Sequence, residues 1–272
     1  MSCRALTVQD ISCLGQCSMA AALPVISACG VECALLPTAL LSTHTGAEFT
    51  PPYIASLAGA LPSVLAHWKG MGITFDGVGI GYLGSRTLVE QVCEGLDALC
   101  GEDTLVLLDP VMGDEGRFYQ GFDADYAAAM RALCGRCRIL LPNLTEACLL
   151  LDAPMEAGRD LSGCLELAAG LNALGAETVA LTGLELRPHQ ITNLVRMSDG
   201  QYALLNHVRL PGSYHGTGDL FAAAVLGRTL RGDEVPEAVR RAGRFVSAAI
   251  ARTPKEKRYG TCFEECLHLL WE

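Results

Sequence analysis

Lysine is nearly absent from this chain of 272 residues, which contains only Lys69, Lys255 and Lys257. None of them follows a glycine-rich turn and no GxxxxGK[ST] motif is present, so a P-loop nucleotide site is excluded. The formal net charge of −10 argues against nucleic acid as the main partner, because phosphate backbones are bound by clustered Lys and Arg. Any phosphate chemistry must therefore use backbone N–H groups, arginine or a metal ion.

Long uninterrupted apolar runs are also missing. The two stretches without formal charge, Ile11–Val31 and Phe49–Trp68, are broken by Pro, Gly, Ser, Gln or His. Each is better explained as a loop followed by a buried helix than as a membrane span. The N-terminal residues do not form the pattern of a secretion signal. We therefore expect a cytoplasmic protein with no membrane partner.

Cysteine, in contrast, is abundant, with 13 residues. The odd number and the lack of a secretion signal favour reduced thiols over a disulfide framework. The CxxC pair of Cys134 and Cys137 has no second pair at zinc-site spacing, so we interpret it as structural.

Short β-type segments alternate with helical patterns along the chain. Several of these strands are apolar without alternation, which is typical of a parallel sheet covered by helices on both faces. We therefore expect residues 1–272 to form one α/β domain with a mostly parallel central sheet. The expected strands are Ala5–Val8, Cys33–Leu36, Gly77–Ile80, Thr104–Leu108, Ile139–Leu141, Thr178–Leu181, Ile191–Met197 and Tyr202–Val208. The expected helices are Ser18–Cys29, Tyr53–Met71, Ser85–Leu99, Tyr126–Leu133, Ser162–Leu174, Asp219–Leu230, Pro236–Ala251 and a short C-terminal helix.

Polar and glycine residues gather just after these strands, although half of the sequence is apolar. Ligands of such sheets bind beyond the carboxyl ends of the strands, so these residues form the candidate site. They are Asp10, Thr43-His44-Thr45-Gly46, Gly81-Tyr82, Asp109-Pro110, Asn143 with Glu146, Thr182-Gly183, and Gly216-Thr217-Gly218-Asp219.

The Gly216–Asp219 turn precedes an apolar segment, Leu220–Leu226, that predicts a buried helix. The N–H groups of Gly216, Thr217 and Gly218 would then point into the protein and form an anion hole for a phosphoryl group. Asp219 would sit in the first turn, where the positive helix end favours its charged form and makes it a weak base. A weak base is sufficient for phosphoryl transfer. The alternative is an ordinary glycine turn with a capping Asp.

Two further segments carry acids at strand ends. Asp109–Asp114 follows a strand and places a carboxylate where it can order waters around Mg²⁺. In Pro142–Glu146, Asn143 and Glu146 have the spacing of a helix capping box. They are either a structural cap or residues that face the metal and the phosphates.

Taken in order, these motifs resemble the ribokinase superfamily, and most closely its pyridoxal kinase branch. The resemblance covers nearly the whole chain. It implies an αβα sandwich, often a homodimer, that transfers the γ-phosphate of ATP to a primary alcohol. That alcohol would be the hydroxymethyl group of pyridoxal, pyridoxamine or pyridoxine. The matching segments are Gly15–Pro24, Thr43–Gly46, Gly81-Tyr82, Asp109–Asp114, Pro142–Glu146 and Gly216–Asp219.

Carried over to this sequence, the resemblance implies Asp219 as the catalytic base and Gly216, Thr217 and Gly218 as the anion hole. It also implies Mg²⁺, bound through water, and a possible role for K⁺. The residues facing ATP and Mg²⁺ would be Asp109, Asn143, Glu146 and Thr182, with Asp109 and Glu146 nearest the metal. The residues facing the pyridine would be Asp10, His44, Thr45 and Tyr82.

Two positions depart from the pyridoxal kinase pattern, and a third leaves the identity of the substrate open. Asp10 stands where a Ser often touches the substrate, and an acid there could pair with the pyridine nitrogen or an amine. Thr182 stands where a phosphate-side Lys is frequent, and Arg117 is a candidate replacement. His215 precedes the anion hole, where hydroxymethylpyrimidine kinases of the same superfamily also present polar residues, so that activity remains an alternative.

A second motif favours a different class of enzyme. Gly79-Ile80-Gly81-Tyr82-Leu83-Gly84 is a literal GxGxxG between a strand and a helix, with Asp109 at the end of the next strand. This is the spacing of a dinucleotide-binding fingerprint and would indicate an NAD-dependent oxidoreductase. That interpretation leaves the Gly216–Asp219 turn unexplained. A non-catalytic vitamin-binding protein would leave it unexplained as well.

Overall fold

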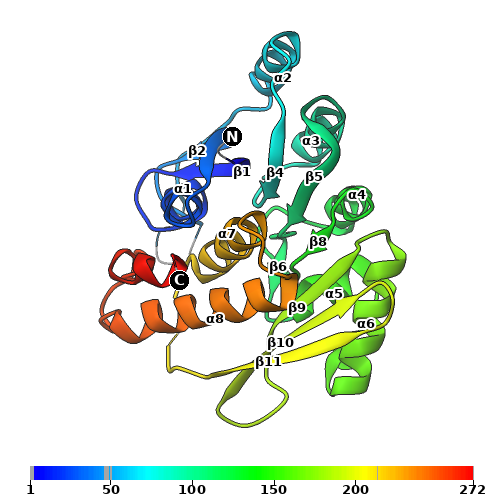
Figure 1. Ribbon diagram of the computed structural model, residues 1–272, viewed down its shortest axis with the longest axis vertical. Coiled ribbons are helices and arrows are strands. Elements are labelled where there is room, and N and C mark those ends of the chain that lie inside the picture. The colour runs from blue at the N-terminus through cyan, green and yellow to red at the C-terminus, as the bar shows by residue number, and fades with distance from the viewer. Residues whose placement is uncertain (1–2, 46–48, 50, 213, 272) are drawn as a thin grey trace.

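A nine-stranded sheet runs through the centre of the molecule (Figure 1). The computed structural model describes residues 3–45, 49, 51–212 and 214–271. The strand order is β11-β10-β9-β8-β5-β4-β1-β2-β3, and all neighbours from β2 to β9 pair in parallel. The strands at the two edges pair antiparallel. The strands are β1 (Arg4–Ser12), β2 (Glu32–Leu41), β3 (Ile54–Ser56), β4 (Phe75–Ile80), β5 (Cys100–Leu108), β8 (Ile139–Leu140), β9 (Thr178–Leu184), β10 (Gln190–Met197) and β11 (Tyr202–Val208). A small hairpin of β6 (Gly113–Asp114) and β7 (Arg117–Phe118) follows β5.

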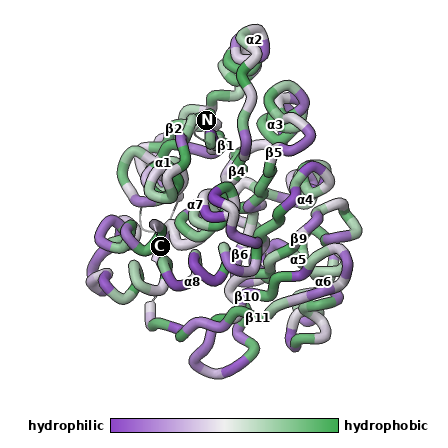
Figure 2. The backbone as a smooth tube through the Cα atoms, in the orientation of Figure 1, coloured by the Kyte–Doolittle hydropathy of each residue, from purple (hydrophilic) through white to green (hydrophobic). Residues whose placement is uncertain are grey.

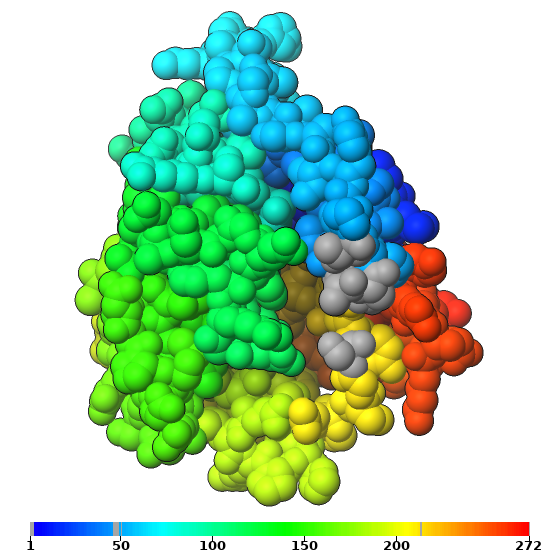
Figure 3. Space-filling model, turned by 180° about the vertical axis from the view of Figure 1, so that it is seen from behind, coloured from blue at the N-terminus to red at the C-terminus, as the bar shows by residue number. Residues whose placement is uncertain are grey.

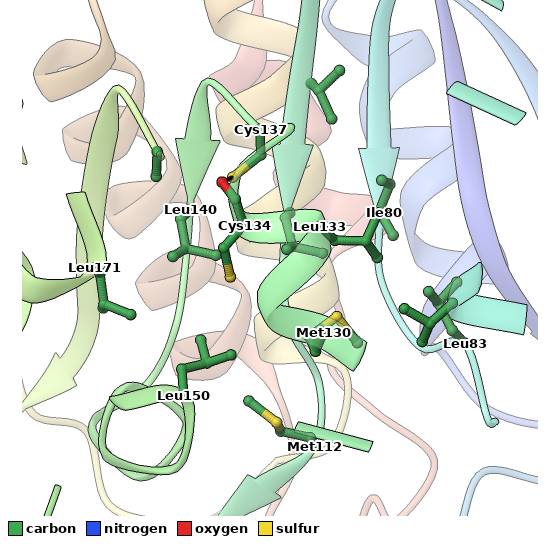
Figure 4. Close-up of a cluster of buried hydrophobic side chains, with 14 of the residues drawn as sticks. Ile80, Leu83, Met112, Met130, Leu133, Cys134, Cys137, Leu140, Leu150 and Leu171 are labelled. Atoms are coloured by element: carbon green, nitrogen blue, oxygen red, sulfur yellow. Dashed lines mark hydrogen bonds between the residues drawn. The ribbon is translucent and has the colours of Figure 1, made fainter. Parts of the chain in front are cut away.

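Helices cover both faces of the sheet, and each face has its own apolar core. One core contacts α2 to α6, and the other contacts α1, α7, α8 and η3. Figure 4 shows the first core, where Leu133 of α4 lies between Leu140 of β8 and Ile80 of β4. Figure 2 shows apolar residues along β4 and β5 and hydrophilic residues along α8. The helices are α1 (Ser18–Ala28), α2 (Leu61–Gly70), α3 (Arg86–Leu99), α4 (Ala124–Cys134), α5 (Leu144–Leu151), α6 (Leu161–Ala173), α7 (Thr217–Leu230) and α8 (Val235–Arg252), with short 3₁₀ helices η2 (Met155–Gly158) and η3 (Glu264–Leu270).

The mostly parallel α/β sandwich predicted from the sequence is confirmed, with three local corrections. Residues 54–56 form the edge strand β3, so the helix expected over Tyr53–Met71 begins only at Leu61. Pro51 and Pro52 favour extended backbone just before this point. β1 continues to Ser12 and β9 to Leu184, so Asp10 and Thr182 lie within strands rather than after them. Among the described residues, no helix is long and apolar enough to cross a membrane.

Helices α1 and α7 lie side by side on one face of the sheet, and a glycine allows their close approach. A Cβ atom added at Gly227 of α7 would lie 2.6 Å from the Sγ of Cys29 and 2.8 Å from its Cβ. On its other side, α7 packs onto glycines of β4. A Cβ at Gly77 would lie 2.7 Å from Leu230, and one at Gly79 would lie 2.9 Å from Leu226. α7 is therefore held deep against the sheet.

We predict that Gly227→Ala lowers the free energy of unfolding by about 1–3 kcal/mol, because the new methyl group overpacks the contact with α1. This loss should exceed the gain in helix propensity, which is at most about 1 kcal/mol. Urea denaturation measures the difference. Gly70→Ala in α2 is the matched control, since its Cβ would meet nothing within 4 Å. Equal stabilities of the two variants would contradict the proposed contact.

Candidate active site

Three carboxylates from different elements meet beyond the carboxyl ends of β4, β5 and β8. Asp109 follows β5, Glu146 lies in the first turn of α5, and Asp219 lies in the first turn of α7. Burial, followed by the charges of Glu146 and Asp219, raises the pKa of Asp109 well above its ordinary value. Figure 3 shows the surface hollowed at this place, with atoms of α7 at the base. The hollow is bordered by the segment of β6 and β7, the segment that follows β2, and the segment after β11.

The first turn of α7 has the geometry expected of an anion site. Gly216 is the N-cap with φ 80°, and a Cβ there would lie 2.1 Å from the carbonyl oxygen of Gln16, so only glycine fits. The N–H of Leu220 donates to the carbonyl of Gly216 at 3.0 Å. The N–H groups of Thr217 and Gly218 precede this first helical bond and have no partner within the helix. Gly218 is exposed, and a Cβ built on it would lie 3.8 Å from Oδ2 of Asp109.

The expectation that Asp219 is a weak base is wrong. Burial raises the pKa of Asp219 to about 7, against the lowering effect of a hydrogen bond from the Ser18 N–H, and the charge of Asp10 raises it further. The favourable helix end is outweighed because the surrounding protein removes water from the carboxylate. Asp219 is therefore a stronger base than its position in the helix alone predicts.

Glu146 and Asn143 form the capping box that their spacing predicts. The Asn143 side chain accepts from the Glu146 N–H at 2.9 Å, and Glu146 accepts from the Asn143 N–H at 2.9 Å. Glu146 also accepts from the N–H of Met112 at 3.1 Å, while Asn143 Nδ2 donates to the carbonyl of Gly113 at 2.9 Å. The box thus fastens the loop after Asp109 to α5. Burial nevertheless raises the pKa of Glu146 to about 7.

The predicted pyridine side contains Asp10 and Tyr82. Asp10 is only 2 % exposed, and it accepts from the hydroxyls of Ser12 at 2.9 Å and Ser18 at 2.5 Å. Tyr82 is half-buried, with its ring centroid 5.6 Å from that of Phe122. Burial and then the charge of Asp10 raise the pKa of Tyr82.

Four aromatic rings gather at the other border of the pyridine side, and they come from the segment between β2 and β3, the segment before α7 and the segment after α8. The ring of His44 lies 4.3 Å from that of His215 and 4.7 Å from that of Phe49, and Phe49 stacks on Tyr259 at 5.2 Å. Thr45 is exposed beside this cluster, and Gly46 lies outside the described residues. His44 was predicted to face the substrate, whereas no local motif in the sequence marks Phe49 or Tyr259.

The predicted nucleotide side lies along β8 and β9. Asn143 and Thr182 form an isolated parallel bridge, and their chain neighbours Leu144 and Gly183 line a cavity of about 280 Å³. Arg117, the suggested cation, is on the β6–β7 hairpin with its side chain 78 % exposed and 3.4 Å from Glu115. The structure therefore does not bring Arg117 into the carboxylate cluster.

A second cavity, of about 20 Å³, is lined by Asp109 and Asp219, and it is large enough for one water molecule. Gln9 lines it and donates to the hydroxyl of Thr7 at 2.9 Å. A Cβ at Gly81 would lie 2.5 Å from Oε1 of Gln9. Gly79 and Gly81 of the GxGxxG segment are thus glycines because a larger side chain would collide with Leu226 and Gln9, respectively.

Residues 18–262 match the sequence profile described as phosphomethylpyrimidine kinase. The chain belongs to the phosphomethylpyrimidine kinase family. It is 29% identical over 262 residues to a pyridoxine/pyridoxal/pyridoxamine kinase of Bordetella avium, covering 91% of this chain and 84% of that protein. It is 36% identical to the crystal structure of pyridoxal kinase from Lactobacillus plantarum, with a TM-score of 0.89 and coverage of 98% and 96%. A Bacteroides thetaiotaomicron protein assigned as a phosphomethylpyrimidine kinase and solved with pyridoxal has 32% identity, a TM-score of 0.93 and coverage of 99% and 96%.

Membership of the phosphomethylpyrimidine kinase family confirms the resemblance drawn from the six motifs. It also overturns the dinucleotide-binding interpretation of Gly79–Gly84, whose glycines serve helix and side-chain packing instead. Ser18, the first residue of α1, is not among the site residues predicted from the motifs. No sequence signal marks the hydrogen bond from its hydroxyl to Asp10 of β1.

We predict that Asp219→Asn stabilises the unliganded protein at pH 8 by on the order of 2–4 kcal/mol, with the gain fading toward pH 4–5. Folding raises the pKa of Asp219 from 3.8 to about 7, so the carboxyl takes up a proton as the chain folds. Folding therefore becomes less favourable as the pH rises between these two values. Urea denaturation across pH measures the effect. The exposed Asp103→Asn is the control and should change stability by less than about 0.5 kcal/mol. A gain independent of pH would contradict the raised pKa.

Proposed function

We propose that this protein is an ATP-dependent kinase that phosphorylates the 5′-hydroxymethyl group of the vitamin B6 vitamers pyridoxal, pyridoxamine and pyridoxine. The observation that carries the proposal is the amide end of α7, which opens into the hollow with Asp219 in its first turn and Asp109 beside it. The names of the related kinases support the same substrates.

Asp219 would accept the proton of the substrate hydroxyl as that oxygen bonds to the γ-phosphorus, while the bond from the γ-phosphorus to the bridging β–γ oxygen breaks and ADP leaves. A pKa of about 7 suits this role, because such a base is partly charged near neutral pH and holds the proton it receives. The N–H groups of Gly216, Thr217 and Gly218 would stabilise the negative charge of the phosphoryl group during transfer. The low lysine content of the chain fits a site that relies on backbone donors.

The acids of the site fit Mg²⁺, which prefers oxygen ligands and keeps several waters. Among the described residues, no group of three or more His, Cys, Asp or Glu side chains could hold a metal directly. We therefore place Asp109 and Glu146 near Mg²⁺ through water, with the remaining ligands from the phosphates. Mg²⁺ would neutralise charge on the phosphates and on these acids. A need for K⁺ stays a prediction from the family resemblance.

We place the pyridine ring against Tyr82, with His44 and Thr45 at its border and Asp10 behind it. Asn143 and Thr182 would border the nucleotide, whose nucleoside end can use the cavity next to Leu144 and Gly183. A single domain over residues 1–272, a homodimer and a cytoplasmic location remain predictions.

Hydroxymethylpyrimidine is the second candidate substrate. The family description and the contact between His215 and His44 favour it, because a second imidazole at the ring border adds hydrogen-bonding capacity. Both candidates use the same carboxylates and anion hole, so only the acceptor distinguishes them.

A coupled assay of ADP release tests the proposal with the three B6 vitamers, hydroxymethylpyrimidine and ribose as acceptors. We expect the highest kcat/KM with a B6 vitamer. For that acceptor, Asp219→Ala should lower kcat by about 10³-fold or more and leave the affinity for ATP within a few-fold, since the carboxylate acts mainly in the transition state. Activity with none of the acceptors, or a variant near wild-type activity, would overturn the proposal.

We also predict that the binding of ATP with Mg²⁺ at pH 7 releases protons. Burial raises the pKa values of Asp109 and Glu146, and a nearby cation lowers them again. Calorimetry in two buffers of different ionisation enthalpy measures the number released. Glu146→Gln, which keeps a side chain suited to the capping box, should release fewer protons. An unchanged number would exclude Glu146 from the metal site.

A further inference from the structure

Gln16, in the loop between β1 and α1, lies against the turn that forms the amide end of α7. A Cβ atom built on Gly216 would lie 2.1 Å from the carbonyl oxygen of Gln16 and 3.1 Å from its carbonyl carbon. Gly216 is the N-cap of α7 and has a φ of 80°, in the left-handed region. The main chain of Gln16 therefore packs directly on the main chain of the turn whose N–H groups form the proposed anion hole.

Residues 257–264, which we call the C-terminal segment, contact Gln16 with three of their members. The Gln16 N–H donates to the carbonyl oxygen of Tyr259 at 2.7 Å. The Gln16 side chain donates through Nε2 to Oε1 of Glu264, the first residue of η3. A Cβ atom built on Gly260 would lie 2.6 Å from the Cβ of Gln16. The backbone, the stem and the amide of Gln16 thus all contact the C-terminal segment.

Hydrogen bonds and a buried ring fix the C-terminal segment in turn. The Cys262 N–H donates to the hydroxyl of Thr253 at 2.9 Å, and Nζ of Lys257 donates to the carbonyl oxygen of Thr261 at 3.0 Å. Phe263 is 2 % exposed and lies in the apolar core shared with α1, α7 and α8. The segment resists displacement, because moving it would break these bonds and expose the ring to water.

We propose that Gln16 is a positioning residue for the anion hole and that the C-terminal segment keeps it in place. The inference rests on the proposed kinase function. The N–H groups at the start of α7 stabilise the transition state only if they are directed at the phosphoryl group. Gln16 keeps the turn at Gly216 from moving toward the loop before α1, so a displaced Gln16 would misalign these donors. The C-terminal segment thereby acts on the reaction through one main-chain contact.

The first experiment compares Gly260→Ala with Gly232→Ala, using kcat and KM. Both glycines have left-handed φ values, 115° and 99°, so both substitutions strain the backbone. A Cβ at Gly260 would meet Gln16, whereas one at Gly232 would meet no described atom within 4 Å. We expect kcat to fall about 10- to 100-fold in Gly260→Ala, with KM for ATP within about 3-fold, because the anion hole is displaced while the nucleotide surface remains. Gly232→Ala should keep the wild-type kcat.

A pair of exchanged side chains tests the contact between Gln16 and Glu264. Gln16→Glu places two carboxylates together and should lower kcat about 10-fold, because their repulsion moves the loop. Adding Glu264→Gln supplies an amide that can donate to the new carboxylate, so kcat should return to within about 3-fold of wild type. Recovery in the double variant would show that this contact, and not the loss of the Gln16 amide itself, controls the rate.

Gln201→Glu is the matched control. Gln201, in the turn between β10 and β11, also donates through Nε2 to an acid, Oδ2 of Asp199 at 2.9 Å. The substitution creates the same repulsion in a turn that is not part of the proposed site, so kcat should stay at the wild-type value. Thermal melting of every variant checks that it is folded.

A transition-state analogue provides a second readout. ADP with aluminium fluoride and a B6 vitamer mimics the phosphoryl group during transfer, so its affinity depends on the anion hole. Calorimetry should show this affinity about 10-fold lower in Gln16→Glu, with the affinity for ADP alone unchanged. A residue needed only for folding would not separate the two affinities.

The inference is overturned if folded Gln16→Glu keeps kcat within about 2-fold of wild type, or if the double variant is as slow as Gln16→Glu alone. Equal losses of kcat in Gly260→Ala and Gly232→Ala would also contradict it. Inactivity of the wild type with every acceptor would instead reject the kinase function. In that event the melting temperatures of both single variants and the double variant still test the contact. The double variant should melt above Gln16→Glu, and merely additive shifts would reject the contact itself.

Discussion

Dehydration of the Asp219 carboxylate is the physical constraint on which the rest of the site depends. The helix end and the Ser18 N–H favour its charge, yet burial dominates and raises its pKa to about 7. Asp219 lies in the first turn of a helix that packs closely against its neighbours, at its N-cap against the carbonyl oxygen of Gln16 and further along against Cys29 and the glycines of β4. The packing of α7 thus stabilises the fold and also holds the carboxylate where burial makes its charged form costly, as in many active sites.

The capping box at α5 illustrates how one local motif can serve structure and site together. Asn143 and Glu146 cap the helix as their spacing predicts, and they also hold the loop that follows Asp109. A structural cap and a site residue were opposed interpretations of the sequence. In the fold they are compatible, because the Glu146 carboxylate, which accepts two N–H groups, still lies beside Asp109 and keeps a raised pKa.

The hollow has two chemically different borders. The side of β5, β8 and α7 presents acids and backbone donors, which suit phosphates and a hydrated cation. The other side presents Tyr82 and the ring cluster of His44, Phe49, His215 and Tyr259, which suits a flat heterocycle. Family membership and the similarity to solved pyridoxal kinases agree with this division.

The sequence by itself determined the features that depend on near neighbours in the chain. Apolar strands alternating with helices predicted the parallel sandwich, three-residue spacing predicted the capping box, and glycines before an apolar run predicted the amide end of α7. Only the tertiary structure decided the edge strand β3, the raised pKa of Asp219 and the contact between Gln16 and Gly216. The reason is that desolvation and long-range hydrogen bonds arise when β1, α1 and α7 pack together. No local pattern records which residues that packing brings into contact.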